Sequence, residues 1–105
     1  MSGAPFNGMN YIDGAWRTGV AAFETRSPSD LDDVVGTYAK AGAADVEEAM
    51  AAARRALPAW RSFNMQARAD ILRKAGDLLM ARMTEIGTLL SREEGKTLPE
   101  AIGEA

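Results

Sequence analysis

The chain has 105 residues, 47% of them hydrophobic and 26% charged, so it has the composition and length of at most one globular domain. Its 12 basic and 15 acidic residues give a net charge of -3, which argues against a nucleic-acid-binding protein, because such proteins need a basic face. The absence of Cys and His excludes a disulfide, a thiolate nucleophile and an ordinary zinc site.

Turn formers and β formers alternate over the first forty positions. Residues 1–8 are small and turn-prone, which predicts a loose N-terminal end. Asp13-Gly14 lies between β formers and favours a two-residue hairpin, because both turn positions need a positive φ. Further short strands are predicted at residues 23–28 and 34–40. We therefore expect residues 9–40 to form a small antiparallel meander.

The pattern becomes helical from residue 42 onward. Apolar residues recur at helical spacing from Val46 to Trp60. Pro58 is expected to end the regular helix and to leave Trp60 packed beyond it. Asn64 favours the start of a second helix as its N-cap. The stripe of the second helix that we expect to be buried consists of Ile71, Leu72, Ala75, Leu78 and Leu79.

A third helix is predicted to restart near Thr84 and to stop at Gly95, with an apolar face made of Ile86, Leu89 and Leu90. Thr97 and Glu100 form a capping-box pattern that begins a fourth helix. Only the first turns of that helix precede Ala105, so we expect a truncated or longer polypeptide. The predicted fold class is α+β: a β meander, and then three helices and the start of a fourth over residues 42–105.

Gly95-Lys96-Thr97 resembles the end of a phosphate-binding loop. The glycine that opens such a loop would fall at Leu90, inside a helical apolar stripe, and no strand precedes it. The pattern is better interpreted as a helix stop, with Lys96 placing positive charge near the C-terminal end of the preceding helix. We therefore expect no nucleotide binding at this corner.

Several short motifs occur together in one order along the chain. They are Asn10-Tyr11-Ile12-Asp13-Gly14-x-Trp16, Ser27-Pro28, Ala44-Asp45-Val46-x-x-Ala49-x-x-Ala52-Ala53, Trp60, Arg68-Ala69-x-Ile71-Leu72 and Glu93-x-Gly95-Lys96-x-x-x-Glu100-Ala101-x-x-Glu104. Each motif is weak alone, but the ordered set is specific. From about Met9 to the last residue, the chain resembles the N-terminal portion of the NAD(P)-dependent aldehyde dehydrogenase superfamily.

The resemblance implies a larger enzyme, in which this segment belongs to an α/β Rossmann-like coenzyme-binding domain and the parent is a homo-oligomer. Such enzymes oxidise aldehydes to carboxylates through a cysteine thioester, with hydride transfer to NAD(P)+ and a glutamate base. The catalytic cysteine, the base and the glycine-rich cofactor loop are absent here. We therefore predict that the chain alone is inactive and binds no NAD(P). A fainter resemblance is to dehydrogenases of carboxylated semialdehydes, such as 2-oxoglutarate semialdehyde.

The resemblance also implies a structural cation between Glu93 and the backbone carbonyls of Thr25 and Arg26. Ser27 stands where the family more usually has Asn before the proline. The alternative is that Glu93 caps or pairs locally. For the whole chain, the alternative to a dehydrogenase segment is a non-catalytic small helical interaction module, whose apolar faces would need a partner.

No apolar run approaches the about 20 residues that a membrane-spanning helix needs, and no secretory leader follows Met1. We therefore expect a cytoplasmic protein that binds neither a membrane nor nucleic acid.

Overall fold

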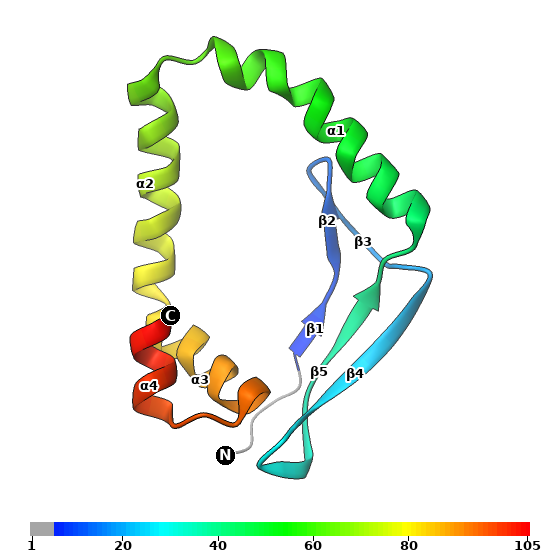
Figure 1. The fold of residues 1–105 in the computed structure, drawn as a ribbon, viewed down its shortest axis with the longest axis vertical. Coiled ribbons are helices and arrows are strands. Elements are labelled where there is room, and N and C mark those ends of the chain that lie inside the picture. The colour runs from blue at the N-terminus through cyan, green and yellow to red at the C-terminus, as the bar shows by residue number, and fades with distance from the viewer. Residues whose placement is uncertain (1–5) are drawn as a thin grey trace.

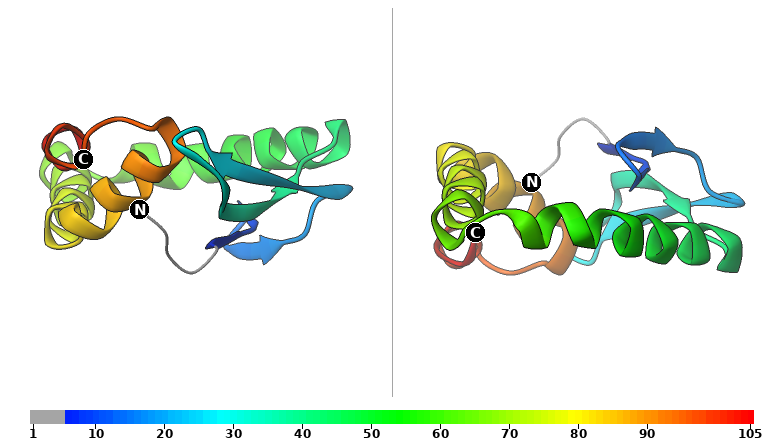
Figure 2. Two further views of the ribbon diagram at one scale, coloured as in Figure 1. Left: turned by 90° about the horizontal axis from the view of Figure 1, so that it is seen from below. Right: turned by 90° about the horizontal axis from the view of Figure 1, so that it is seen from above.

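The computed structural model describes residues 6–105, which form an open, flat ring with extents of 48 × 33 × 17 Å (Figure 1). The strands occupy one side of the ring and the last three helices the other, with the first helix spanning between them (Figure 2). The radius of gyration is 17.0 Å, whereas a compact domain of this length has about 13 Å. The chain therefore does not close around one core.

The strands form two groups. β1 (Phe6–Gly8), β5 (Asp30–Lys40) and β4 (Ala21–Ser27) make a sheet in the order β1-β5-β4, while β2 (Asn10–Ile12) and β3 (Ala15–Arg17) pair only with each other. The β4 and β5 pair is antiparallel, but β1 runs parallel to β5.

Within residues 9–40, where an antiparallel meander was expected, both pairings are antiparallel, but they lie in two separate sheets and do not form one continuous meander. The parallel strand β1 precedes that range and was not predicted. Local turn signals specify only neighbouring antiparallel strands, whereas a parallel pair joins segments far apart in sequence and has no local signature. The loose end expected for residues 1–8 is also wrong for Phe6–Gly8, because β5 offers them a strand edge. Residues 1–5 lie outside the described residues.

The hairpin between β2 and β3 turns at Asp13-Gly14, as predicted. Both turn residues have positive φ, 52° at Asp13 and 77° at Gly14. This is the conformation that matches the twist of the flanking strands, and Gly adopts it without steric cost. Across the hairpin, the rings of Tyr11 and Trp16 lie 4.8 Å apart, centroid to centroid, and both side chains are exposed.

Four helices follow: α1 (Ala43–Ser62), α2 (Met65–Ala81), α3 (Met83–Glu94) and α4 (Leu98–Glu104). The Asp45 carboxylate accepts a hydrogen bond from the Gly42 N–H (2.7 Å) at the start of α1. Asn64 caps α2 as predicted, because its side-chain oxygen accepts from the Ala67 N–H at 2.8 Å. The α+β class and the number of helices are confirmed.

Pro58 does not end α1, which corrects the expectation from the sequence. Proline lacks an N–H and therefore removes one helical hydrogen bond, but its fixed φ is compatible with helix, so the next turn can still form. The helix instead ends at Ser62, and the following residue, Phe63, has an extended backbone and an N–H that bonds to the Trp60 carbonyl. Trp60 consequently lies in the last turn of α1, not beyond the helix.

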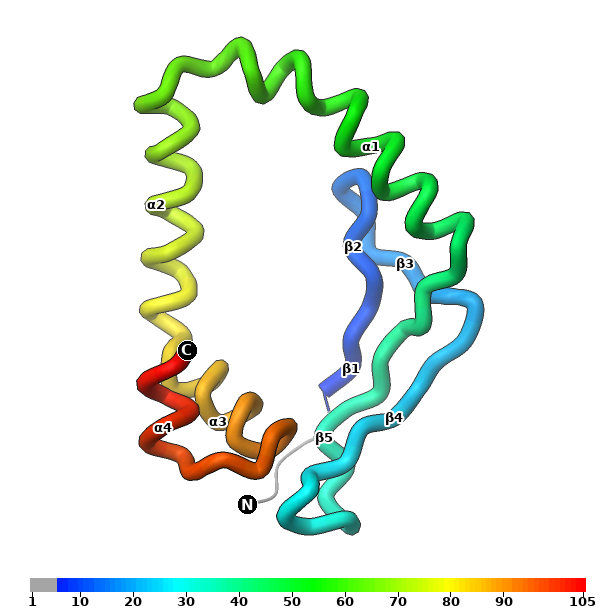
Figure 3. Tube along the Cα trace, viewed as in Figure 1, coloured from blue at the N-terminus to red at the C-terminus, as the bar shows by residue number. Residues whose placement is uncertain are grey.

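The apolar stripe predicted on α2 is present but is not buried. Every residue from 69 to 82 is exposed, including Ile71 at 50% and Leu72 at 65%. Figure 3 shows why: α1 and α2 form an arch, and no other described segment runs along the outside or inside of α2. The periodicity correctly predicted an amphipathic helix, but it carried no information on what covers the apolar face.

Buried hydrophobic residues are few in the described part of the chain: Ile12, Val35 and Ala101. Helices α3 and α4 pack closely against each other, since a Cβ on Gly87 would lie 2.6 Å from the Ile102 Cα. None of the helices in residues 6–105 is long and apolar enough to cross a membrane.

Candidate functional site

A buried ion pair fastens the end of α3 to the sheet. The Arg92 guanidinium donates two hydrogen bonds to the Asp33 carboxylate, from Nε at 3.0 Å and from an Nη at 2.7 Å. The same guanidinium donates to the Val34 carbonyl at 3.1 Å. The side chains are only 6% and 2% exposed, so this is a bidentate pair shielded from water.

Each partner stabilises the charged form of the other. The hydrogen bonds from Arg92 lower the pKa of the Asp33 carboxyl, against the opposing effect of burial. The hydrogen bond to Asp33 raises the pKa of Arg92. Sequence reasoning missed both residues. The available signal was that Asp33 lies two positions before Val35 in a strand and therefore shares its buried face.

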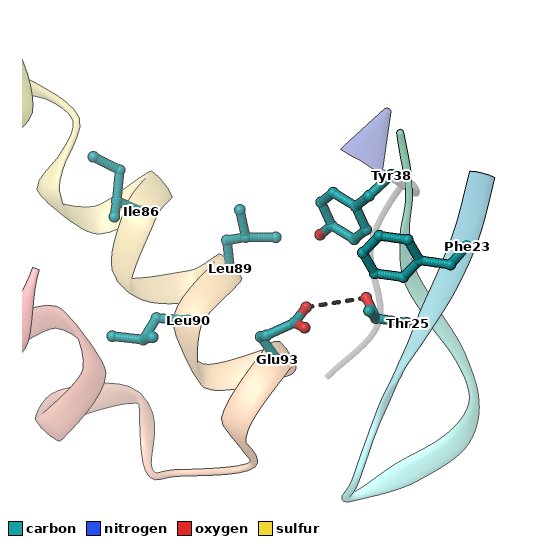
Figure 4. Close-up of a pocket in the computed structure, with 7 residues that line it drawn as sticks. All are labelled: Phe23, Thr25, Tyr38, Ile86, Leu89, Leu90 and Glu93. Atoms are coloured by element: carbon teal, nitrogen blue, oxygen red, sulfur yellow. Dashed lines mark hydrogen bonds between the residues drawn. The ribbon is translucent and has the colours of Figure 1, made fainter. Parts of the chain in front are cut away.

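Beside this pair, a groove of about 370 Å³ runs between α3 and the β4–β5 pair (Figure 4). The aromatic rings of Phe23 and Tyr38 form its sheet side, and α3 supplies the opposite side. Glu93 lies at one end, where its carboxylate accepts a hydrogen bond from the Thr25 hydroxyl at 3.1 Å. The complete lining is Phe23, Thr25, Tyr38, Ile86, Leu89, Leu90 and Glu93.

Of the residues predicted for a cation, Thr25 and Glu93 are in contact through the Thr25 hydroxyl, whereas the prediction concerns the backbone carbonyls of Thr25 and Arg26. The Arg26 side chain itself bonds to the Leu31 carbonyl (2.8 Å) and the Glu24 carboxylate (2.6 Å). The strand pairing is irregular from Thr25 to Ser27. No cluster of three or more metal-ligating side chains occurs in residues 6–105. Any cation here would therefore depend on backbone carbonyls.

The corner after α3 is a helix stop, as predicted. Gly95 has φ 75°, and its N–H bonds to the Ser91 carbonyl at 2.8 Å. Lys96 pairs with Glu94 at 3.0 Å and also with Glu104, and these hydrogen bonds raise its pKa, with Glu104 the larger cause. The Lys96 ammonium is thus held by local carboxylates.

The capping box predicted for α4 does not form. The Thr97 hydroxyl donates to the Glu100 carboxylate at 2.6 Å and makes no bond to the helix backbone. Pro99 lies in the first turn of α4, where the missing N–H is tolerated.

These contacts position elements and do not assemble a reaction centre. The groove offers one carboxylate and the hydroxyls of Thr25 and Tyr38, and the chain contains no cysteine to act as a nucleophile. The site instead joins the start of a sheet to a helix corner, in an arrangement that known proteins share. A model of the aldehyde dehydrogenase family matches residues 16–105. The chain belongs to the aldehyde dehydrogenase family.

Two curated aldehyde dehydrogenases show the extent of the similarity. The chain is 39% identical to α-ketoglutaric semialdehyde dehydrogenase of Bacillus subtilis over 98 residues, which cover 91% of this chain and 20% of the relative. It is 42% identical over 92 residues to N-succinylglutamate 5-semialdehyde dehydrogenase of Burkholderia mallei, covering 87% of this chain and 19% of that protein.

The fold agrees with a solved aldehyde dehydrogenase structure. The crystal structure of an NAD-dependent aldehyde dehydrogenase from Sinorhizobium meliloti superposes with a TM-score of 0.91 at 32% identity, over 96% of this chain and 21% of that one. The resemblance to the N-terminal portion of the family is thereby confirmed. The chain spans about a fifth of the length of the aldehyde dehydrogenases that it matches.

Proposed function

We propose that residues 1–105 are the N-terminal part of an NAD(P)-dependent aldehyde dehydrogenase domain. In the whole protein this part would dock against the remainder of the fold, and the whole protein would oxidise an aldehyde to a carboxylate through a cysteine thioester. The observation that carries the proposal is that the chain reproduces the fold of a dehydrogenase segment at a TM-score of 0.91 while covering 21% of that dehydrogenase.

The exposed surface supports a docking role. The chain exposes 7657 Å², whereas a compact protein of its mass exposes about 5,700 Å². Helices α1 and α2 contain no buried residue, and they expose large apolar side chains such as Val46, Leu57 and Leu72. Exposed apolar surface of this kind is typical of a surface that another part of a protein covers.

Catalysis would come from the remainder of the fold, because the chain has no cysteine. Alone, it is predicted to be inactive and to bind no NAD(P). For the whole protein we propose a carboxylated semialdehyde as substrate, supported by the names of both curated relatives, which are semialdehyde dehydrogenases.

A complementation experiment tests this proposal. The portion of the Bacillus subtilis relative outside its match to this chain, here called the complementary fragment, is produced alone and mixed with the 105-residue chain. We expect reduction of NAD+ or NADP+ with α-ketoglutaric semialdehyde in the mixture and in neither part alone. Absence of turnover together with absence of binding would contradict the docking role. Binding without turnover would favour the alternative, a non-catalytic interaction module.

We also propose that a structural cation binds between Glu93 and the carbonyls of Thr25 and Arg26. One carboxylate with backbone oxygens is a hard donor set, and the irregular pairing of these strand residues supports it. The alternative, local pairing, is supported by the bond from Thr25 to Glu93. Hydrogen exchange of the β4 amides in KCl and in tetramethylammonium chloride discriminates the two. Protection that depends on K+ and disappears in Glu93→Gln supports the cation, and equal protection contradicts it.

We propose three further features of the whole protein. It has a dehydrogenase domain that includes residues 1–105, it assembles as a homo-oligomer, and it is cytoplasmic, without nucleic-acid or membrane partners. The net charge of -3 supports the exclusion of nucleic acid.

A further inference from the structure

A patch at the junction of α1 and α2 combines apolar side chains with a cation. A groove of about 320 Å³ is lined by Trp60, Met65, Arg68, Ala69 and Leu72. Met65 is 79% exposed, so the groove is open to solvent on the side that Met65 forms. Trp and Arg are the residue types that most often anchor protein interfaces.

The Arg68 side chain has a buried donor without an acceptor. Its Nε is buried and makes no hydrogen bond within the described residues 6–105. A buried donor left unpaired costs the desolvation of the group without a compensating bond. The neighbours one helical turn away offer no carboxylate, since they are Asn64, Met65, Ile71 and Leu72.

The nearest acidic residue on α2 is already engaged. The Asp70 carboxylate accepts a hydrogen bond from the Gln66 amide at 2.7 Å. Elsewhere the chain pairs its guanidinium groups when a carboxylate is available, as in Arg82 with Glu85 on the next helix and in the buried Arg92 pair. Arg68 therefore differs from these arginines in having a sheltered guanidinium nitrogen and no partner on its own face.

We infer that the groove beside Arg68 is a docking site for a carboxylate-bearing segment of the dehydrogenase fold outside residues 1–105, an inference that rests on the proposed function. The carboxylate accepts from the Arg68 guanidinium, and an apolar neighbour on the same segment fills the space between Trp60 and Leu72. Charge complementarity selects an acidic occupant, because the groove contains one cation and no acid. The planar guanidinium suits a carboxylate held by two bonds.

The test measures binding of the 105-residue chain to the complementary fragment by isothermal titration calorimetry. Arg68→Met keeps the length of the stem and removes every donor. Arg73→Met, in the exposed part of the same helix, makes the identical change of charge and is the matched control. We expect Arg68→Met to weaken binding at least about tenfold, a ratio set by loss of a charge-assisted pair, and Arg73→Met to stay within about twofold.

A second measurement separates docking from a role in folding. Because Arg68→Met removes an unpaired buried donor, hydrogen exchange in α2 of the isolated chain should stay equal or become slower. If Arg68 instead stabilised α2 within the isolated chain, Arg68→Met would make hydrogen exchange in α2 faster. Arg68→Lys, which retains the charge but loses the planar fork, should bind with intermediate strength.

Several outcomes would overturn the inference. These are equal weakening by the two Met variants, unchanged binding of Arg68→Met, no binding by the unmodified chain, and saturation of the groove by a second copy of the chain in sedimentation. The proposed function is judged separately, by turnover in the mixture. If turnover is restored and Arg68→Met binds like Arg73→Met, the function stands and the assigned docking site is wrong.

Discussion

Two parts of the ring differ in how their side chains find partners. The part made of β4, β5, α3 and α4 has a buried bidentate ion pair, a tight helix crossing and a glycine corner, all formed by its own residues. The arch made of α1 and α2 is equally regular in sequence but contains no buried residue. Helical periodicity therefore does not show whether a helix packs within its own chain. The contacts of α3 and α4 are made by residues of this chain, whereas the apolar faces of α1 and α2 are covered by none of the described residues.

The largest expected effect comes from breaking the ion pair. Arg92→Met leaves the Asp33 carboxylate buried without its partner, which is more costly than never having had the pair. We expect loss of hydrogen-exchange protection throughout α3 and β5, with little change in α1. Equal loss of protection in α1 and α2 would contradict the view that the ion pair stabilises only the part made of β4, β5, α3 and α4.

Lowering the pH should destabilise the same part of the ring, which contains the ion pair. The pKa of Asp33 is lowered in the folded chain from its ordinary value of 3.8. Its contribution to stability is therefore complete above that value and is lost as the pH falls through the folded pKa. Exchange in β5, measured at equal intrinsic rate from pH 5 to about pH 3, should accelerate. Asp33→Asn should remove the part of this dependence that the pairing with Arg92 causes.

The crossing of α3 and α4 gives the next largest effect. Gly87→Ala places a Cβ against the Ile102 backbone, which is less able to shift than a side-chain end. We expect a loss of about 1–3 kcal/mol, as for an overpacked core. Faster exchange of the α4 amides measures it. Gly76→Ala on α2 has open space around its new Cβ and is the control, expected to be neutral or stabilising.

A smaller effect is expected at the start of α2. Asn64→Ala removes the acceptor for the Ala67 N–H and should cost about 1 kcal/mol of local helix stability. Circular dichroism of the isolated chain would show partial loss of helix. Asn64→Asp retains the acceptor and should preserve the signal; equal losses in both variants would contradict the capping role.

The smallest effect on the isolated chain, and the most informative for the arch, is expected from its apolar stripe. Leu78→Gln replaces a side chain that is 59% exposed, so the stability of the chain alone should change by no more than about 0.5 kcal/mol. The same substitution should weaken binding to the complementary fragment. A large loss of stability in the chain alone would show that the arch is self-sufficient.

The sequence predicted elements whose signals are local. Asp13-Gly14, Asn64 and Gly95 each mark a boundary through their own backbone or side-chain chemistry, and all three lie where expected. The bond from the Thr25 hydroxyl to Glu93 is the local pairing that was the alternative to a cation at this corner. The pairing of β1 with β5 and of Asp33 with Arg92 has no local signature, because each joins residues far apart in sequence. The burial of α2 failed as a prediction because periodicity describes a face and not its partner.

The parallel pairing of Phe6–Gly8 with Gly36–Tyr38 has a consequence for the order of folding. The β4–β5 hairpin closes through a two-residue turn, whereas β1 can add to β5 only after the whole intervening segment has been confined, at a greater loss of chain entropy. The sheet therefore grows outward from the hairpin, and β1 joins it last. By microscopic reversibility β1 is also the first strand to detach, so transient opening of this sheet begins at its parallel edge.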